Sequence, residues 1–277
     1  MKKDAHRYIL LLTAVLIVAI CPAAYAHNIW LNPSNQFPEV GTTVDIGIGW
    51  GHKFPANRVD EEIKEGRVEA VRAIDPDGMA VDLSKVSTGL YRLKIDKPGA
   101  YLVTARIKPG FFTKTPKGRE RGNKTTIPDA VKCTNYHIQG KTILIAGGSD
   151  KNLSQTAGQP LEIVPLTNFQ RMKPGDALSV KLLFDGKPLP DVKVKATYAG
   201  FEAADTAPHK HEAKGQKGHG HHMHFPVETV TDAGGQADLK LEKSGYWMIV
   251  LSHRCPYSDT AVCDEFMHNV AFTFEVK

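Results

Sequence analysis

The stretch TVDIGIGW, residues 43–50, decides the fold class of this chain. Its large apolar residues, Val44, Ile46, Ile48 and Trp50, stand at every second position, with polar or small residues between them. A period of two is typical of a β-strand that buries one face. The stretch therefore predicts a half-buried strand, and its neighbours in sequence are the first candidates for its partner.

The residues before this stretch form the other arm of a predicted hairpin. NIWLNPS, residues 28–34, has the composition of a strand, and the SNQFPEVG segment has that of a turn. A simple antiparallel hairpin centred on that turn gives opposite residues index numbers that add up to about 79. This register places His27 opposite His52. Opposite Cβ atoms lie about 5 Å apart, so the two imidazoles could share one metal ion.

Strand-like segments of the same kind continue along the chain. In the first half they lie at residues 68–83, 89–95, 99–107 and 142–147. In the second half we expect two hairpins and a closing pair of strands: 177–201, which turns at DGKPLPD, 228–241, which turns at DAGG, and 245–254 with 269–277. No segment has a clean helical period.

A connector separates the two halves. Residues 147–176 begin with a polar run rich in glycine, serine and asparagine, which is typical of a link between domains. A chain of this length suits two domains of ordinary size or one large β domain. We therefore predict an all-β fold of two β-sandwich domains, with the boundary between residues 154 and 155. Short strands with regular turns are typical of immunoglobulin-like and transthyretin-like sandwiches.

The first 26 residues have the layout of a secretory signal peptide. Basic residues in MKKDAHRY precede the apolar run ILLLTAVLIVAI, and AYA at 24–26 supplies small residues before a cleavage site. The apolar run is too short for a membrane span. We therefore predict a mature chain that begins at His27, is exported to the periplasm and does not insert stably into a membrane. Its basic residues are spread along the sequence, which argues against a nucleic-acid partner.

Three cysteines follow the signal peptide. Cys255 and Cys263 are close in sequence, and an exported protein meets oxidising conditions. The sequence therefore predicts a disulfide between Cys255 and Cys263. Cys133 is left over, as a buried free thiol or as one end of a link between molecules.

The histidines are an unusual supply of metal ligands, because neutral imidazole binds Ni, Co, Cu and Zn ions well. Half of the 12 histidines of the chain fall in the polar segment 208–226. We interpret this segment as a loop that gathers metal ions, with a solvated linker as the alternative. Its histidines are His209, His211, His219, His221, His222 and His224.

Two further pairs of histidines are candidates for an ordered metal site. His27 would offer its free amine and its Nδ1, with His52 as the third nitrogen, a T-shaped set that suits Cu(II) or Ni(II). His253 ends one strand of the predicted closing pair and His268 begins the other. A disulfide between Cys255 and Cys263 would close the loop between them and hold its base, so we expect the two histidines near each other. They are interpreted as metal ligands or as parts of a structural loop. His137 is expected to be an ordinary strand or loop residue.

Motifs of hydrolytic or phosphoryl-transfer enzymes do not occur in the sequence: it has no G-x-S-x-G element and no glycine-rich phosphate loop. We therefore do not predict an enzyme. The alternative is a copper-binding protein or copper oxidase, because lytic polysaccharide monooxygenases also use an N-terminal histidine brace on an immunoglobulin-like core. A third hypothesis is a structural or carbohydrate-binding sandwich with incidental histidines.

Several motifs, in their order along the chain, resemble those of a known family: AHNIWLNPS, GWGHKFPANR, IDPDG, GQPLEIVPL and the closing FTFEV. They are similar to exported proteins described as periplasmic components of cobalt/nickel uptake systems, many of which carry only a label of unknown function. The resemblance implies an immunoglobulin-like domain over 27–154 and a transthyretin-like or carboxypeptidase-regulatory-like domain over 155–277. It also implies binding of Ni or Co ions and their delivery to an inner-membrane importer, so we favour Ni or Co as the metal and keep Cu or Zn as alternatives. Asn28 stands where the family has an acidic residue, so no ligand role is carried over to that position.

Overall fold

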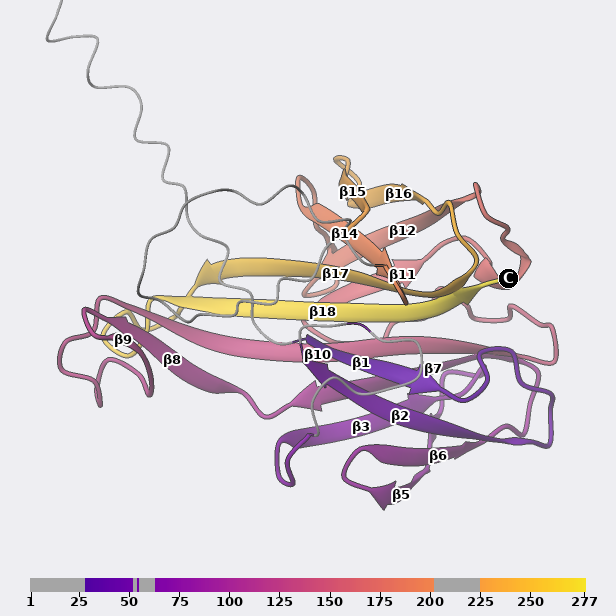
Figure 1. The fold of residues 1–277 in the computed structure, drawn as a ribbon, viewed down its shortest axis with the longest axis horizontal. Helices are drawn as coiled ribbons and strands as arrows, with labels where there is room; N and C mark the ends of the chain where they lie inside the picture. Colours follow the sequence, from indigo (N-terminus) through magenta and orange to yellow (C-terminus); the bar gives the residue numbers. More distant parts are fainter. Residues whose placement is uncertain (1–27, 52–53, 55–62, 202–224) are drawn as a thin grey trace, which may run out of the picture.

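The computed structural model describes residues 28–51, 54, 63–201 and 225–277. These residues form three sheets, of which the largest runs through the middle of the molecule (Figure 1). The first sheet has four strands in the order β1-β2-β6-β5. Their bounds are β1 (Asn28–Pro33), β2 (Thr43–Gly51), β6 (Leu90–Lys94) and β5 (Leu83–Ser87).

The largest sheet has ten strands. Eight of them follow the order β15-β14-β17-β18-β10-β7-β3-β4, and β8 and β9 extend the sheet beside the first half of β10. The strands from the first half of the chain are β3 (Val68–Ile74), β4 (Ala80–Val81), β7 (Gly99–Ile107), β8 (Gly110–Thr115), β9 (Gly118–Arg121) and β10 (Lys132–Ala146). Those from the second half are β14 (Lys193–Tyr198), β15 (Val227–Val230), β17 (Gly245–Pro256) and β18 (Glu265–Val276).

The third sheet again has four strands: β11 (Leu161–Pro165), β12 (Ala177–Phe184), β13 (Lys187–Pro188) and β16 (Gln236–Lys240). A single 3-10 turn, Phe169–Arg171, is the one helical element of the described residues. None of the described segments is a helix long and apolar enough to cross a membrane. The predicted all-β fold class is therefore confirmed.

The two small sheets pack on opposite faces of the large one, because successive side chains of a strand point to opposite sides. On β10, Ile143 and Ile145 join the core beneath the third sheet, whereas Leu144 and Ala146 join the core beneath the first sheet. β7 and β10 thus supply both cores, and each small sheet buries its apolar face on one of them.

The first and second halves of the chain meet in the middle of the large sheet. β10, from the first half, pairs in parallel with β18, the last strand, over Thr134–Thr142 opposite Glu265–Thr273. Strands of both halves therefore lie in one continuous sheet, and the core beneath the third sheet takes Ala100 and Leu102 from the first half. The division into two domains between residues 154 and 155 stays a prediction.

The first hairpin has the register that its sequence predicted. β1 and β2 are antiparallel from Asn28 opposite Gly51 to Pro33 opposite Ile46, so opposite index numbers add up to 79 throughout. Gly49 lies opposite Trp30, and a Cβ built on it would stand 1.9 Å from the indole Nε1. Glycine is required at this position because the buried indole occupies the space of a side chain.

Two of the three strand pairings predicted for the second half are wrong. The arms of 177–201 are β12 and β14, which lie in different sheets, and the arms of 228–241, β15 and β16, are likewise separated. Alternating apolar residues show that a strand buries one face. This pattern is the same for two strands that are paired in one sheet and for two strands that face each other from different sheets. Pro188 and Pro190, in the DGKPLPD turn, also lack the N–H that a longer ladder needs. The closing pair, β17 with β18, is confirmed.

The predicted disulfide pairing is also wrong. Cys133 is bonded to Cys263, with a Cα–Cα distance of 4.9 Å, and Cys255 is free and half-buried. The parallel pairing of β10 with β18 sets Thr134 opposite Glu265, which brings Cys133, near the start of β10, close to Cys263, two residues before β18. Cys255 lies opposite Phe266 on β17, so its nearness to Cys263 in sequence does not bring the two sulfur atoms into bonding position.

Candidate functional site

Three histidines lie side by side on three adjoining strands of the large sheet. His268 of β18 is opposite His137 of β10 in the parallel ladder and opposite His253 of β17 in the antiparallel ladder. The rings of His137 and His268 stack with centroids 4.9 Å apart and an interplanar angle of 25°. The predicted proximity of His253 and His268 is confirmed, and we call the three residues the histidine row.

Aromatic side chains cover the histidine row. Phe184, at the end of β12 in the third sheet, packs against His253 and His268 with ring centroids 4.5 and 5.3 Å away. Phe266 packs against His137 and His268 from within β18, at 5.7 and 5.9 Å. His268 is the most enclosed of the three and is 7% exposed.

Burial keeps the imidazoles of the row neutral. Desolvation, with the neighbouring His137 and His253, lowers the pKa of His268 to about 4. Desolvation also lowers the pKa of His137, with a contribution from Arg106, and the pKa of His253, which Asp185 partly offsets. Neutral imidazole is the form that binds a metal ion, so the row is in the ligand-competent protonation state at neutral pH.

The geometry of the row is that of stacked rings, not of ligands around one ion. The Nε2 of His137 is 2.6 Å from the Oδ1 of Asn135; because an amide oxygen accepts, this nitrogen donates and Nδ1 keeps the lone pair. Among the described residues, no three His, Cys, Asp or Glu side chains are arranged to hold a metal ion. His253 and His268 would therefore have to turn before they could bind one.

The other predicted ligands lie outside the described residues. These are His27, His52 and the six histidines of the 208–226 segment, His209, His211, His219, His221, His222 and His224. The described residues next to His27 and His52 in sequence are Asn28 and Gly51, which lie opposite each other at the end of the β1–β2 hairpin.

Aromatic residues and one arginine gather near this end of the hairpin. The guanidinium of Arg67 lies 5.4 Å from the ring centroid of Trp50 and 5.8 Å from that of Tyr136. On the neighbouring side, the ring of Phe54 contacts Trp30 at 5.8 Å and Tyr246 at 5.0 Å. The end of the hairpin is therefore held by packed rings, which would give a ligand there a rigid support.

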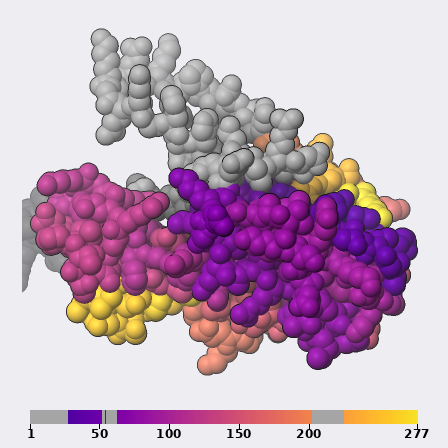
Figure 2. Space-filling model, turned by 90° about the horizontal axis from the view of Figure 1, so that it is seen from below, coloured from indigo at the N-terminus to yellow at the C-terminus, as the bar shows by residue number. Residues whose placement is uncertain are grey.

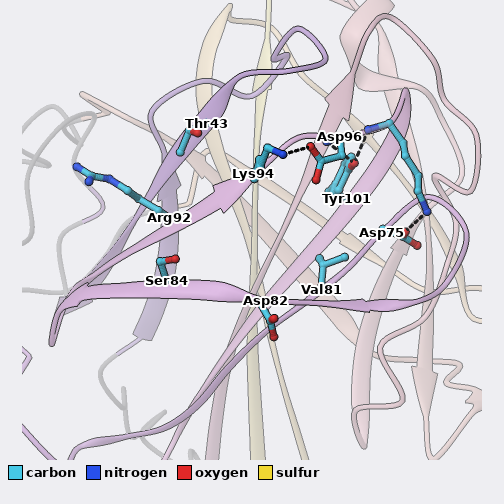
Figure 3. Close-up of a pocket in the computed structure, with 10 residues that line it drawn as sticks. Thr43, Asp75, Val81, Asp82, Ser84, Arg92, Lys94, Asp96 and Tyr101 are labelled. Atoms are coloured by element: carbon cyan, nitrogen blue, oxygen red, sulfur yellow. Dashed lines mark hydrogen bonds and ion pairs between the residues drawn. The ribbon is translucent and has the colours of Figure 1, made fainter.

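A polar cavity of about 600 Å³ lies elsewhere, between the first sheet and the β3–β4 edge of the large sheet (Figure 3). Most of its charged groups are already paired: Lys94 Nζ is 2.8 Å from Asp96, Lys97 Nζ is 2.6 Å from Asp75, and Arg92 pairs with Asp45. The Tyr101 hydroxyl accepts backbone N–H groups of Asp96 and Lys97. Because these ion pairs occupy the cations of the lining, the histidine row is the stronger candidate among the described residues.

A family model matches residues 24–254, and the family is described as a domain of unknown function, DUF4198. The chain belongs to this family. No curated protein matches this DUF4198 chain. The match includes β1, β2 and most of β17, and so contains His253 of the histidine row but ends before His268.

Several solved structures are similar to the DUF4198 chain at low identity. The D00-D0 domain of intimin is 12% identical with a TM-score of 0.21, over 89% of this chain and 99% of that one. The adhesin InvE of Yersinia pseudotuberculosis is 13% identical with a TM-score of 0.20, over 89% of this chain and 58% of that one. The fibronectin(III)-like modules of Clostridium thermocellum CbhA are 9% identical with a TM-score of 0.20, over 90% and 94%.

Sequence reasoning missed His137 as a member of the row. It lies 116 positions before His253 and 131 before His268 along the DUF4198 chain, and only the parallel β10–β18 ladder brings it to them. A parallel pairing of two such distant strands leaves no local signal in the sequence. Asp185, which acts to raise the pKa of His253 and of His268, was also missed, because it follows β12 in the third sheet and no local pattern in the sequence shows how that sheet packs.

We expect the DUF4198 chain to lose stability in mild acid through His268. Its pKa of about 4 lies below the ordinary value near 6.5, so the unfolded chain binds a proton that the folded chain excludes. The contribution is therefore present above pH 6.5 and falls as the pH drops toward 4, by roughly 3 kcal/mol at most.

The measurement is urea unfolding at pH 7 and pH 4.5 for the wild type, His268→Phe and, as the control, the less buried His253→Phe. His268→Phe should flatten the pH dependence more than His253→Phe does. An equal pH dependence in wild type and His268→Phe would contradict this role of His268.

Proposed function

We propose that this protein binds a divalent transition metal ion through His27 and His52 in the periplasm and delivers it to an inner-membrane importer. The observation that carries the proposal is the β1–β2 register, in which six consecutive pairs from Asn28–Gly51 onward keep the predicted alignment. The proposal continues this register by one residue. It also takes His27 as the first residue of the mature chain, so that its amine is a ligand.

The metal is proposed to be nickel or cobalt, with copper and zinc as alternatives. The resemblance of the chain to periplasmic components of cobalt/nickel uptake systems supports this choice. The histidines of 208–226 are proposed to gather ions before transfer to the ordered site. His253 and His268 are assigned no part in the first site, because both rings pack against Phe184 in the histidine row.

The test is calorimetric titration of the chain that begins at His27 with Ni, Co, Cu and Zn ions. We expect at least one site tighter than about 10 μM that weakens as the pH falls through the histidine range, because protons compete for the nitrogens. His27→Ala and His52→Ala should each weaken it about 100-fold. One extra residue before His27 should have a similar effect, because it blocks the amine.

Two control chains separate the proposed sites. Deletion of 208–224 should remove weak binding and leave the tight site, and His137→Phe should change neither. A tight site that survives both His27→Ala and His52→Ala would overturn the proposal. Intrinsic affinity favours copper at nitrogen sites, so copper binding alone would not distinguish the hypotheses. Copper binding together with peroxide-driven turnover of a reductant would favour the copper oxidase hypothesis.

A further inference from the structure

The end of the large sheet that carries β8 and β9 presents a basic surface. Lys132 of β10 lies opposite Lys114 of β8, and Lys114 lies opposite Arg119 of β9, so three cations stand in one row across three strands. Arg121, two residues beyond Arg119 on β9, lies on the same face and opposite Phe112. We call Lys114, Arg119, Arg121 and Lys132 the basic row.

These charges have few partners in the fold. Lys132 forms an ion pair with Glu265 at 2.8 Å, and Glu265 also pairs with Arg254. Within the described part of the chain, Lys114, Arg119 and Arg121 form no ion pair, although the guanidinium of Arg119 lies 5.0 Å from the ring of Phe112. All three are exposed.

Like charges directly opposite each other on neighbouring strands destabilise a sheet. The arrangement of Lys132, Lys114 and Arg119 therefore works against folding, and a ligand with several negative charges would relieve the repulsion. Arginine adds paired N–H donors that match a phosphate group. The basic row thus has the charge and donor groups of a polyanion-binding surface.

The position of the row favours a flat partner. The β8–β9 hairpin and the start of β10 extend beyond the two small sheets and form a lobe at one end of the molecule (Figures 1 and 2). Val131, next to Lys132, is 60% exposed, and its backbone N–H donates to the carbonyl of Lys114. An exposed apolar side chain beside a group of cations suits a partner whose surface is charged and whose interior is apolar.

An extended acidic peptide fits the lobe less well. The free edge is β9, which is four residues long, and such a short edge gives few backbone hydrogen bonds to an added strand. The cations instead spread across the strands, from β10 to β9. We therefore infer that the basic row docks this protein on the phosphate headgroups of an anionic lipid surface, independently of metal binding.

The experiment is co-sedimentation of the chain that begins at His27 with vesicles of phosphatidylcholine that contain or lack phosphatidylglycerol. We expect binding only to the anionic vesicles, and its loss at high salt. A cation near such a surface contributes enough that Lys114→Gln/Arg119→Gln/Arg121→Gln should reduce partition on the order of 100-fold. The control, Lys85→Gln/Lys187→Gln/Lys243→Gln, removes the same charge from exposed sites elsewhere and should reduce partition far less.

Three results would overturn the inference: no binding to anionic vesicles at low salt, equal loss in the two triple variants, or tighter binding to an acidic peptide than to the vesicles. The Lys114→Gln/Arg119→Gln/Arg121→Gln variant should have the thermal unfolding temperature of the wild type, which excludes misfolding as the cause of weaker binding. It should also retain the calorimetric metal affinity of the wild type, so a failure of lipid docking and a failure of metal binding are distinguishable.

Discussion

Replacing Cys133 and Cys263 with alanine is expected to lower the free energy of unfolding by about 2–5 kcal/mol. The disulfide joins residues 130 positions apart, so it removes many conformations from the unfolded chain. Both cysteines are fully buried, and their replacement also takes packed sulfur atoms from the interior. The expected loss is large because the bond fastens the first half of the chain to the last hairpin.

Local contacts at the same place will keep part of the structure together. The carboxylate of Asp264 accepts the backbone N–H of Cys133 at 2.8 Å and pairs with Lys124. The double variant should therefore fold, with a lower urea midpoint. A reducing agent should lower the midpoint of the wild type toward that of the double variant and leave the double variant unchanged. The control is Cys255→Ala, since Cys255 is free, and a double variant as stable as this control would contradict the expectation.

Glu162→Leu is expected to cost about 3–5 kcal/mol. Lys141 is fully buried on β10, and its Nζ lies 3.5 Å from a carboxylate oxygen of Glu162, which is 4% exposed. Glu162 also accepts the backbone N–H groups of Ala157 at 2.8 Å and Gly158 at 3.1 Å. The substitution would therefore leave a buried ammonium group and two backbone donors without their acceptor.

Replacing Lys141 instead of Glu162 should lower the free energy of unfolding less. Burial lowers the pKa of Lys141 to about 8 even though Glu162 acts to raise it, so desolvation of the ammonium outweighs the attraction between the two charges. Lys141→Met removes that cost. It leaves the Glu162 carboxylate buried without its cation, but the carboxylate keeps its two N–H donors. We therefore expect the loss to be at least about 2 kcal/mol smaller than that of Glu162→Leu.

Urea unfolding at pH 7 measures both single variants and the double variant. In the double variant, Lys141→Met should recover part of the loss caused by Glu162→Leu, because no buried charge is then left uncompensated. The wild type should also become more stable as the pH rises above 8, since the unfolded chain binds the Lys141 proton more tightly than the folded chain does. Equal losses in the two single variants would contradict this account.

The candidate metal ligands differ in how far the sequence could define them. The proximity of His253 and His268 was predicted from a loop closed by a Cys255–Cys263 disulfide. That disulfide does not form, and the β17–β18 ladder places the two histidines directly opposite each other. His137 joins them only through the distant β10–β18 pairing. The stacking of the rings and their cover by Phe184 depend on how the third sheet packs, which alternation does not describe.

The sequence by itself determined the all-β class, the register of β1 with β2 and the pairing of β17 with β18. These features are local: alternation marks the strands, and a connecting loop fixes which residues meet. The tertiary structure alone decided that β12 and β14 lie in different sheets, that Cys133 bonds Cys263, and that Lys141 is buried against Glu162. Alternation shows that a strand buries one face but not against which strand, and that choice is made by packing between residues far apart in the chain.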